Sequence, residues 1–331
     1  MIKASIVILL LGGLGVSLFL VASVYNDRGA LGPFILLIPR GASLGDIASI
    51  AEEANLLSSP RIFRAWATIA GYSGKLKPGR YRFDQKPSVA ELIYRLEEGP
   101  REIVVTVVPG MTIREVDDVL SRADLIASGQ LIDFSVDPVR GEYPWIPQLV
   151  PLPGTPLEGF LLPDTYHFYE GEGVGEMVIT MLDNFKRGVL PRILNHDTLY
   201  RTVTIASILE KEVSDPHDER LVAGILEKRL SVGMPLNVDA TVVYVACGGR
   251  YLGCGPVRKS DYNRPSPYNT YYTASIPPGP IGSPSLAAID AALQPMESEY
   301  WYYLSNPQNR ETIFSKTLDE QERNRAKYLK N

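Results

Sequence analysis

The alternation of hydrophobic and polar positions predicts helices interrupted by a few short strands. Apolar residues follow one another in residues 34–38, which is typical of a buried strand. In residues 44–57 they recur every three to four positions, which is typical of a helix that buries one face. Further helices are predicted at residues 60–70, 88–99, 175–187, 202–213, 216–230, 239–245 and 285–293 and from residues 113 and 318, with strands at residues 80–83, 103–108 and 300–304. We therefore expect an α+β fold.

Short polar residues mark where several of these helices begin. Ser43, Ser88 and Thr112 each precede a periodic apolar segment, and their hydroxyl groups can accept a hydrogen bond from a free N–H of the first turn. Asp215 precedes Pro216, a pair that favours an acidic cap followed by proline in the first helical turn. The predicted helix starts therefore rest on capping chemistry as well as on periodicity.

The first residues favour a membrane anchor. Residues 4–26 carry no charged side chain and are long enough to cross about 30 Å of hydrocarbon as a helix. A cleaved secretory signal is the alternative, because Lys3 supplies a short positive segment. Lys3 lies on one side of the apolar segment, and Asp27 and Arg28 nearly cancel on the other, so the positive-inside tendency leaves the rest of the chain outside the cytoplasm. Both interpretations export the chain.

The domain organisation follows from these elements and from a partial internal repeat. Residues 34–57 and 103–120 share the order strand, Pro-Gly turn, Ser/Thr cap and aliphatic helix, although packing alone would also explain this repeat. The order strand, helix, helix, strand is also that of a LysM module, which binds N-acetylated glycan chains. The expected divisions are an anchor at 1–28, a LysM-like subdomain at 29–100, a β-α unit with a connection at 101–156, and a mixed α+β domain with a central helix at 157–331.

Composition and missing motifs exclude several classes of function. The net charge of −5 argues against a nucleic-acid-binding protein. The three histidines are scattered and no Cys-x-x-Cys pair occurs, so we expect no metal site. Walker and Gly-x-Ser-x-Gly motifs are also missing, and we expect no cofactor. Cys247 and Cys254 could close a small disulfide loop in an exported protein, or remain two free thiols.

The helix at residues 202–213 contains the most informative side chain. At about 100° per residue, Glu212 shares a face with Ile205, Ile208 and Leu209. The residues expected on the opposite face are Ser207, Glu210 and Lys211. A carboxyl group directed into an apolar cleft should have a raised pKa, which suits a proton donor. A structural glutamate, either hydrogen-bonded in the core or packed at a rim, remains the alternative.

Three further segments are rich in the residue types that bind sugars. Aromatic rings can stack on pyranose faces, while amides, hydroxyls and carboxylates can bind sugar hydroxyl groups. Turn formation and ordinary packing would explain any one of these segments alone. The candidate substrate-binding residues are Glu158, Asp164, Thr165, Tyr166, Asn237, Asp239, Thr241, Tyr244, Tyr268, Asn269, Thr270 and Tyr271.

Taken together, these segments resemble the MltG (YceG-like) family of membrane-anchored endolytic murein transglycosylases. The matching strings are Ala206-Ser207-Ile208-Leu209-Glu210-Lys211-Glu212, Glu158-Gly159 with Pro163-Asp164-Thr165-Tyr166, Leu236 with Asp239 and Thr241 to Tyr244, Tyr268-Asn269-Thr270-Tyr271, and Ile276-Pro277-Pro278-Gly279-Pro280-Ile281. The resemblance implies that Glu212 is the catalytic acid and that the substrate is the glycan strand of peptidoglycan. It also implies the bacterial inner (cytoplasmic) membrane as location and peptidoglycan synthases as candidate partners. The family's usual histidine motifs near the C-terminus are missing around Glu311 and Glu320, so no function is transferred to those positions.

A lytic transglycosylase can operate with one carboxyl group, because the C6 hydroxyl of N-acetylmuramic acid (MurNAc) serves as the nucleophile. We expect Glu212 to protonate the bond between MurNAc and N-acetylglucosamine (GlcNAc) and then to accept the C6 proton, which leaves 1,6-anhydroMurNAc ends on strands that are being synthesised. We expect Asp164, Asp239, Tyr244 and Tyr268, together with Asn269, to hold the strand. Two alternatives remain open. A second catalytic carboxylate at Asp239 or Asp164 would make the protein a lysozyme-type hydrolase, and a non-catalytic peptidoglycan-binding scaffold would need no acid at all.

Overall fold

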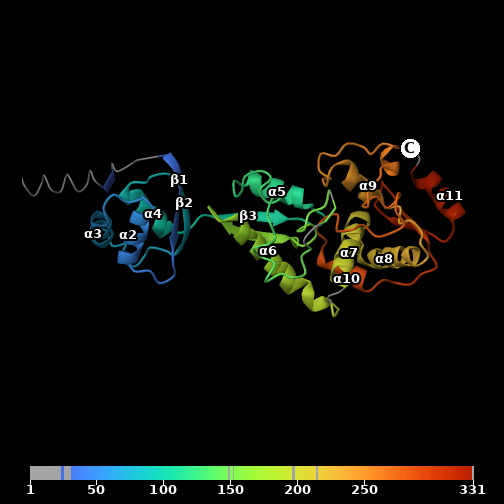
Figure 1. Ribbon diagram of the computed structural model, residues 1–331, viewed down its shortest axis with the longest axis horizontal. Coiled ribbons are helices and arrows are strands. Elements are labelled where there is room, and N and C mark those ends of the chain that lie inside the picture. Colours follow the sequence, from blue (N-terminus) through green and yellow to red (C-terminus); the bar gives the residue numbers. More distant parts are fainter. Residues whose placement is uncertain are drawn as a thin grey trace, which may run out of the picture. The chain divides into compact units, whose positions relative to one another are not determined.

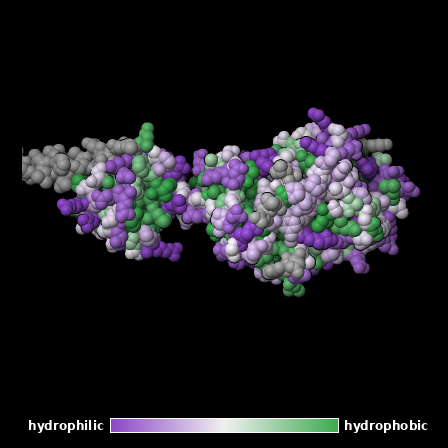
Figure 2. Space-filling view, viewed as in Figure 1, coloured by the Kyte–Doolittle hydropathy of each residue, from purple (hydrophilic) through white to green (hydrophobic). Residues whose placement is uncertain are grey.

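The structure is a computed structural model, shown in Figure 1, which describes residues 24–25, 31–147, 150–151, 153–195, 198–213 and 215–329. The predicted anchor lies outside the described residues except for Val24 and Tyr25. Within the described part of the chain, no helix combines the length and the apolar character that a bilayer span requires. On the face seen in Figure 2, hydrophilic and hydrophobic residues are interspersed.

The described residues form two compact units. Unit 1 contains the described residues up to Val104 together with His167–Glu172, and unit 2 contains the others. The mixture of helices with small sheets confirms the predicted α+β class. The four-part domain division and the LysM-like character of the first unit stay predictions.

In unit 1 an antiparallel pair of strands packs with three helices around one core. The elements are β1 (Leu31–Ile38), α2 (Leu44–Glu53), α3 (Pro60–Ile69), β2 (Gly79–Gln85) and α4 (Val89–Glu98). Leu36 of β1 lies opposite Tyr81 of β2, and both side chains are buried. The predicted order strand, helix, helix, strand is therefore confirmed as a topology.

A capping residue and a turn residue explain where α2 begins and ends. Ser43 forms a capping box with Asp46, because each residue's backbone N–H donates to the other's side chain. Helix α2 ends at Glu53, earlier than the predicted residue 57. Asn55 turns the chain with a φ of 57°, and Leu56, which follows it, enters the core.

The elements that follow unit 1 along the chain include a two-stranded sheet and two helices. The elements are β3 (Glu102–Val107), α5 (Ile113–Arg122), β4 (Asp164–Tyr169) and α6 (Val174–Gly188). Strands β3 and β4 pair with each other, and the boundary between the two units falls within both strands. The hydrophobic pattern did not predict β4. Its inward residues, Tyr166 and Phe168, alternate with exposed polar ones over only six positions, a signal too short to separate from a loop.

The remainder of unit 2 surrounds one central helix. The elements are α7 (Leu199–Glu212), α8 (Pro216–Ser231), α9 (Asp239–Ala246), α10 (Leu286–Leu293), β5 (Tyr302–Ser305), β6 (Thr312–Ser315) and α11 (Leu318–Tyr328), with 3₁₀ turns at Leu190–Arg192 and Asp261–Asn263. Helix α7 packs against α8, α9 and α10 (Figure 1). Strands β5 and β6 form an antiparallel pair in which Tyr303 lies opposite Phe314.

Candidate active site

Glu212 lies at the C-terminal end of α7, where the chain leaves the helix. The next residue, Val213, has an extended backbone, so the helix stops and the Glu212 side chain is half-buried rather than enclosed. The hydroxyl of Tyr303 donates to the Glu212 carboxylate (Oε2) at 3.2 Å. The hydroxyl of Ser305 donates to the backbone carbonyl of Glu212 at 3.1 Å. Strand β5 therefore holds both the side chain and the main chain of this residue.

The surroundings of Glu212 favour its protonated form more than water does for an ordinary glutamate. Burial, which is the larger cause, and the negative charge of Asp239 together raise the pKa of Glu212 to about 7. Hydrogen bonds from the Tyr303 hydroxyl and from the backbone N–H of Ala240 oppose this rise in pKa. The expectation of a raised pKa at this position is confirmed. A carboxyl group with a pKa near 7 can both donate and accept a proton at neutral pH.

Asp239 opens α9 and is held by two tyrosines. Its carboxylate accepts a hydrogen bond of 2.6 Å from the hydroxyl of Tyr271. The side chain of Tyr262 also hydrogen-bonds Asp239, and its ring packs edge-on against the ring of Tyr271 with centroids 4.8 Å apart. Asp239 is exposed, so the site combines a half-buried acid with a solvent-facing carboxylate.

The predicted division of α7 into an apolar face and a polar face is wrong. Ser207, expected on the far side, is buried, and its hydroxyl accepts a hydrogen bond from the backbone of Ile281 at 3.0 Å. Glu210 accepts one from the backbone N–H of Ser285 at 2.8 Å. The helical wheel fails because neighbouring elements cover α7 on several sides. Glu212 is distinguished by its place at the helix end.

Glu158 lies in the interior of unit 2. It is 1% exposed, and its carboxylate accepts one hydrogen bond from the backbone N–H of Ile113 and one from the hydroxyl of Tyr244, each of 3.0 Å. Burial raises the pKa of Glu158 to about 8. Tyr244 and Tyr268 are also fully buried, with ring centroids 5.3 Å apart. This geometry favours a role in positioning neighbouring segments over direct contact with a sugar.

A polar network orders the segment that carries Tyr271. The side-chain amide of Asn269 donates to the backbone carbonyls of Tyr262 and Arg264, and its oxygen accepts from the backbone N–H of Tyr271 at 3.0 Å. Asn269 is itself fully buried. It therefore fixes the turn from which Tyr271 reaches Asp239.

A second part of the network joins the same segment to the start of α9. The hydroxyls of Thr241 and Thr270 lie 2.9 Å apart, and both side chains are buried. Asn237 is exposed and adopts a φ of 51°, while its backbone N–H donates to the carbonyl of Thr270. These three predicted residues therefore join the 268–271 segment to the segment that bears Asp239.

The remaining predicted residues lie on β4. Asp164 and Thr165 are exposed, whereas Tyr166 is buried. The side-chain amide of Asn184 on α6 donates to the carboxylate of Asp164 and to the hydroxyl of Tyr166. The hydroxyl of Thr165 lies 3.2 Å from that of Thr106 on β3. These contacts connect β4 to α6 and β3, whereas the other predicted residues gather around α9.

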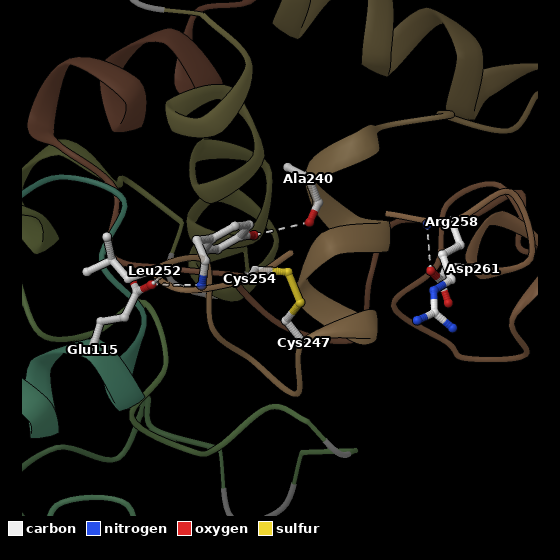
Figure 3. The surroundings of a disulfide bond; sticks show 8 residues. Glu115, Ala240, Cys247, Leu252, Cys254, Arg258 and Asp261 are labelled. Carbon is white, nitrogen blue, oxygen red and sulfur yellow. Dashed lines mark hydrogen bonds between the residues drawn. A yellow bond between two sulfur atoms is a disulfide. The ribbon is translucent and has the colours of Figure 1, made fainter. Parts of the chain in front are cut away.

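Cys247 and Cys254 form a disulfide, with Cα atoms 5.8 Å apart, which decides between the two alternatives left open by the sequence. The loop that it closes is held from two sides (Figure 3). The carboxylate of Glu115 accepts hydrogen bonds of 2.7 Å from the backbone N–H groups of Tyr251 and Leu252. The hydroxyl of Tyr251 donates to the carbonyl of Ala240 at 3.2 Å. The loop thus connects α5 with the first turn of α9.

Sequence reasoning missed Tyr303, Ser305 and Tyr262. The strand at residues 300–304 was expected, but its polar side chains were not linked to the acid. Tyr303 and Ser305 are two positions apart and project from the same side of β5, which was the available signal. The sequence could not show that this side faces the end of α7.

The amino-acid sequence is similar to one protein family and to individual bacterial proteins. Residues 36–327 match the YceG-like family. An endolytic murein transglycosylase of Bacillus subtilis (strain 168) is 27% identical over 310 residues, which covers 88% of this chain and 84% of that protein. A second endolytic murein transglycosylase, from Streptococcus pneumoniae serotype 2 (strain D39), is 26% identical over 318 residues, and the match covers 88% of this chain and 58% of that longer protein.

The fold is similar to a crystal structure of a putative yceG-like protein from Listeria monocytogenes. The TM-score is 0.56 at 25% sequence identity, and the match covers 89% of this chain and 99% of the other. The similarity therefore extends over nearly the whole chain.

Proposed function

We propose a function for this chain, which belongs to the YceG-like family. It is a lytic transglycosylase that cleaves the MurNAc–GlcNAc bond of peptidoglycan glycan strands. The observation that carries this function is the half-buried carboxyl group of Glu212, with a pKa raised to about 7 at the end of α7. Relatives that match most of this chain are named endolytic murein transglycosylases, which supports peptidoglycan as the substrate.

The reaction uses Glu212 twice. Protonated Glu212 donates its proton to the glycosidic oxygen while the bond from that oxygen to C1 of MurNAc breaks. The C6 hydroxyl of the same MurNAc attacks C1, and the Glu212 carboxylate takes the hydroxyl proton. The products are a free GlcNAc hydroxyl and a 1,6-anhydroMurNAc end, and no water is consumed. Acid–base catalysis of this kind contributes about 10²–10⁴-fold to the rate.

One observation favours a second candidate, a lysozyme-type hydrolase. The charge of Asp239 acts on Glu212, so two carboxyl groups share one site, as glycoside hydrolases require. However, Asp239 accepts a short hydrogen bond from Tyr271, which restrains it from acting as a free nucleophile. Mass spectrometry of digested sacculi separates the candidates. Transglycosylase products are one water lighter than hydrolase products, and reducing ends would favour the hydrolase.

The direct test replaces Glu212 and compares the variant with a matched control. Glu212→Gln keeps the shape of the side chain but removes the proton donor, so release of anhydro products from purified sacculi should fall by at least about 100-fold. Glu210→Gln is the control, because an amide oxygen can still accept the hydrogen bond from Ser285. We expect this control to retain most activity. If Glu212→Gln remained active, the assignment of Glu212 as the catalytic acid would be wrong. If the folded wild-type chain bound sacculi but released no product, a non-catalytic peptidoglycan-binding scaffold would be favoured instead.

The cellular setting is part of the same proposal. Residues 4–26 are an uncharged apolar segment, which supports a single-pass anchor in the bacterial inner membrane with the catalytic part outside the cytoplasm. In that position the enzyme would terminate nascent glycan strands next to peptidoglycan synthases. Protease treatment of spheroplasts tests the topology, since digestion of the intact chain from outside is the expected result. Protection until the membrane is lysed would contradict it.

A further inference from the structure

We propose that Tyr303 and Asp239 are positioning residues that act on Glu212 in opposite directions. The charge of Asp239 adds to the effect of burial in favouring the protonated form of Glu212 in the free enzyme, and Tyr303 stabilises the carboxylate once the proton has left. The catalytic part of this inference rests on the proposed transglycosylase function. Its electrostatic part concerns the protein alone and is measured without substrate.

Tyr303 lies on β5, which hydrogen-bonds the elements that follow it. Its backbone carbonyl accepts a hydrogen bond of 2.8 Å from the side-chain amide of Gln321 on α11. Gln321 in turn accepts one of 2.8 Å from the hydroxyl of Ser315 on β6. Ser305 of the same strand donates to the backbone carbonyl of Glu212, so β5 contacts this residue through both its side chain and its main chain.

Tyr303 remains a neutral donor throughout the reaction. Burial, together with the nearby Glu212, raises its pKa well above the usual range, so its hydroxyl keeps its proton at any working pH. A hydroxyl that donates to a carboxylate stabilises the charged form of the acid. Tyr303 therefore favours proton departure from Glu212, and neither gains nor loses a proton itself.

Asp239 acts through its charge. It lies at the start of α9, next to Ala240, whose backbone N–H hydrogen-bonds the Glu212 carboxylate. Tyr271 and Tyr262 donate to Asp239, which stabilises the Asp239 carboxylate and keeps it in place. A second negative charge close to Glu212 disfavours its ionisation. The structure thus provides one group that holds the proton on the acid and another that assists its release.

The other titratable and charged groups around the carboxyl group do not replace this pair. The ammonium of Lys211 lies over the ring of Tyr251, 3.6 Å from its centroid. The hydroxyls of Tyr251 and Tyr271 are neutral, because burial raises their pKa well above the usual value. Arg229 on α8 donates to the backbone carbonyls of Leu236 and Trp301. Its charge acts on Tyr303, where it opposes the rise in pKa.

The test measures the titration of Glu212 in the full-length chain without substrate. Glutamate carboxyl groups are labelled with ¹³C, and the Glu212 signal is assigned by its disappearance in Glu212→Gln. Tyr303→Phe removes one hydrogen bond to the carboxylate, so the pKa of Glu212 should rise by about half a unit or more. Asp239→Asn removes the neighbouring charge, so the pKa should fall by a similar amount. Tyr302→Phe is the matched control, because Tyr302 lies on the opposite side of β5, and no shift is expected.

The same variants carry a kinetic readout. Because the free enzyme must hold a proton on Glu212, kcat/KM falls as pH rises through the pKa of this residue. Asp239→Asn should move that fall to lower pH, and Tyr303→Phe should move it to higher pH while lowering kcat. A merely structural loss would reduce activity at every pH without opposite displacements.

The outcomes separate this inference from the proposed function. Shifts of the two variants in the same direction, or no shift in a folded Tyr303→Phe protein, would overturn the inference even if anhydro products form. Opposite shifts in a protein whose wild type releases no anhydro product would support the electrostatic pairing and overturn the proposed function. If Tyr303→Phe does not fold, Asp239→Asn decides, because a pKa that does not fall contradicts the role of Asp239.

Discussion

Replacement of the buried Glu158 by glutamine should make unit 2 more stable at alkaline pH. Glutamine has the shape of a protonated glutamate. The side-chain oxygen of glutamine can accept from the backbone N–H of Ile113, and its NH₂ group can donate to the hydroxyl oxygen of Tyr244. In the wild type this hydroxyl donates to Glu158 instead. The substitution therefore removes an ionisable group from the core without opening a cavity.

The magnitude follows from the pKa values of the folded and unfolded states. Burial raises the pKa of Glu158 to about 8, whereas the unfolded chain has the ordinary value of 4.5. Between pH 4.5 and about pH 8 the folded state therefore binds one proton more than the unfolded state at this residue. The stabilising contribution is full below the unfolded pKa and is lost as pH rises through the folded pKa. Between pH 5 and pH 8 the wild type should lose about 3.5 kcal/mol from this residue, and the glutamine variant should not.

The assay compares urea unfolding of the two proteins at pH 5 and pH 8, and the difference between them is the measured quantity. Glu115→Gln serves as a contrast. Oε1 of its carboxylate accepts from the backbone N–H groups of Tyr251 and Leu252, and Oε2 accepts from the backbone N–H of Thr112. An amide has only one oxygen and cannot accept on both sides, so this variant should be less stable than the wild type at pH 8. If the stability of Glu158→Gln relative to the wild type did not rise with pH, Glu158 would not be protonated in the folded state and the burial argument would fail.

Three further predictions concern the segments that frame the site. Replacement of Cys247 and Cys254 by serine should destabilise unit 2 by about 2.5 kcal/mol, because the disulfide that closes a loop across a sequence separation of seven is lost. An unchanged unfolding midpoint under oxidising conditions would refute this prediction. Gly282→Ala should lower the free energy of unfolding by about 1–3 kcal/mol, because its Cβ would lie 2.7 Å from the carbonyl oxygen of Gly110. Thermal unfolding measures this change, and an unaltered Tm would show that the two segments can move apart without cost. Asn269→Ala leaves two partly buried carbonyls without their donor, so stability should fall by about 1–3 kcal/mol and proteolysis within residues 261–273 should accelerate. Resistance equal to that of the wild type would contradict the role of this network.

Local chemistry made most elements of the fold predictable. Ser43, Ser88 and Thr112 cap the helices that they precede, because capping involves only a side chain and the first helical turn. Asp215 likewise accepts hydrogen bonds from the first turn of α8. Strands β4 and β6 were missed because each is short and is stabilised by pairing with a partner strand rather than by its own sequence.

The sequence by itself determined that Glu212 lies in the last turn of a helix, because the helical repeat and the Asp215-Pro216 pair that starts the next helix are properties of adjacent residues. It also led us to expect a raised pKa at the Glu212 carboxyl group, although the two-faced helix behind that expectation is wrong. Only the tertiary structure decided what surrounds that carboxyl group. Tyr303 and Asp239 come from a strand and a helix far along the chain, and periodicity carries no information about which distant segments will meet. The same reason explains why Glu158, expected to contact substrate, instead lies in the core beside Tyr244.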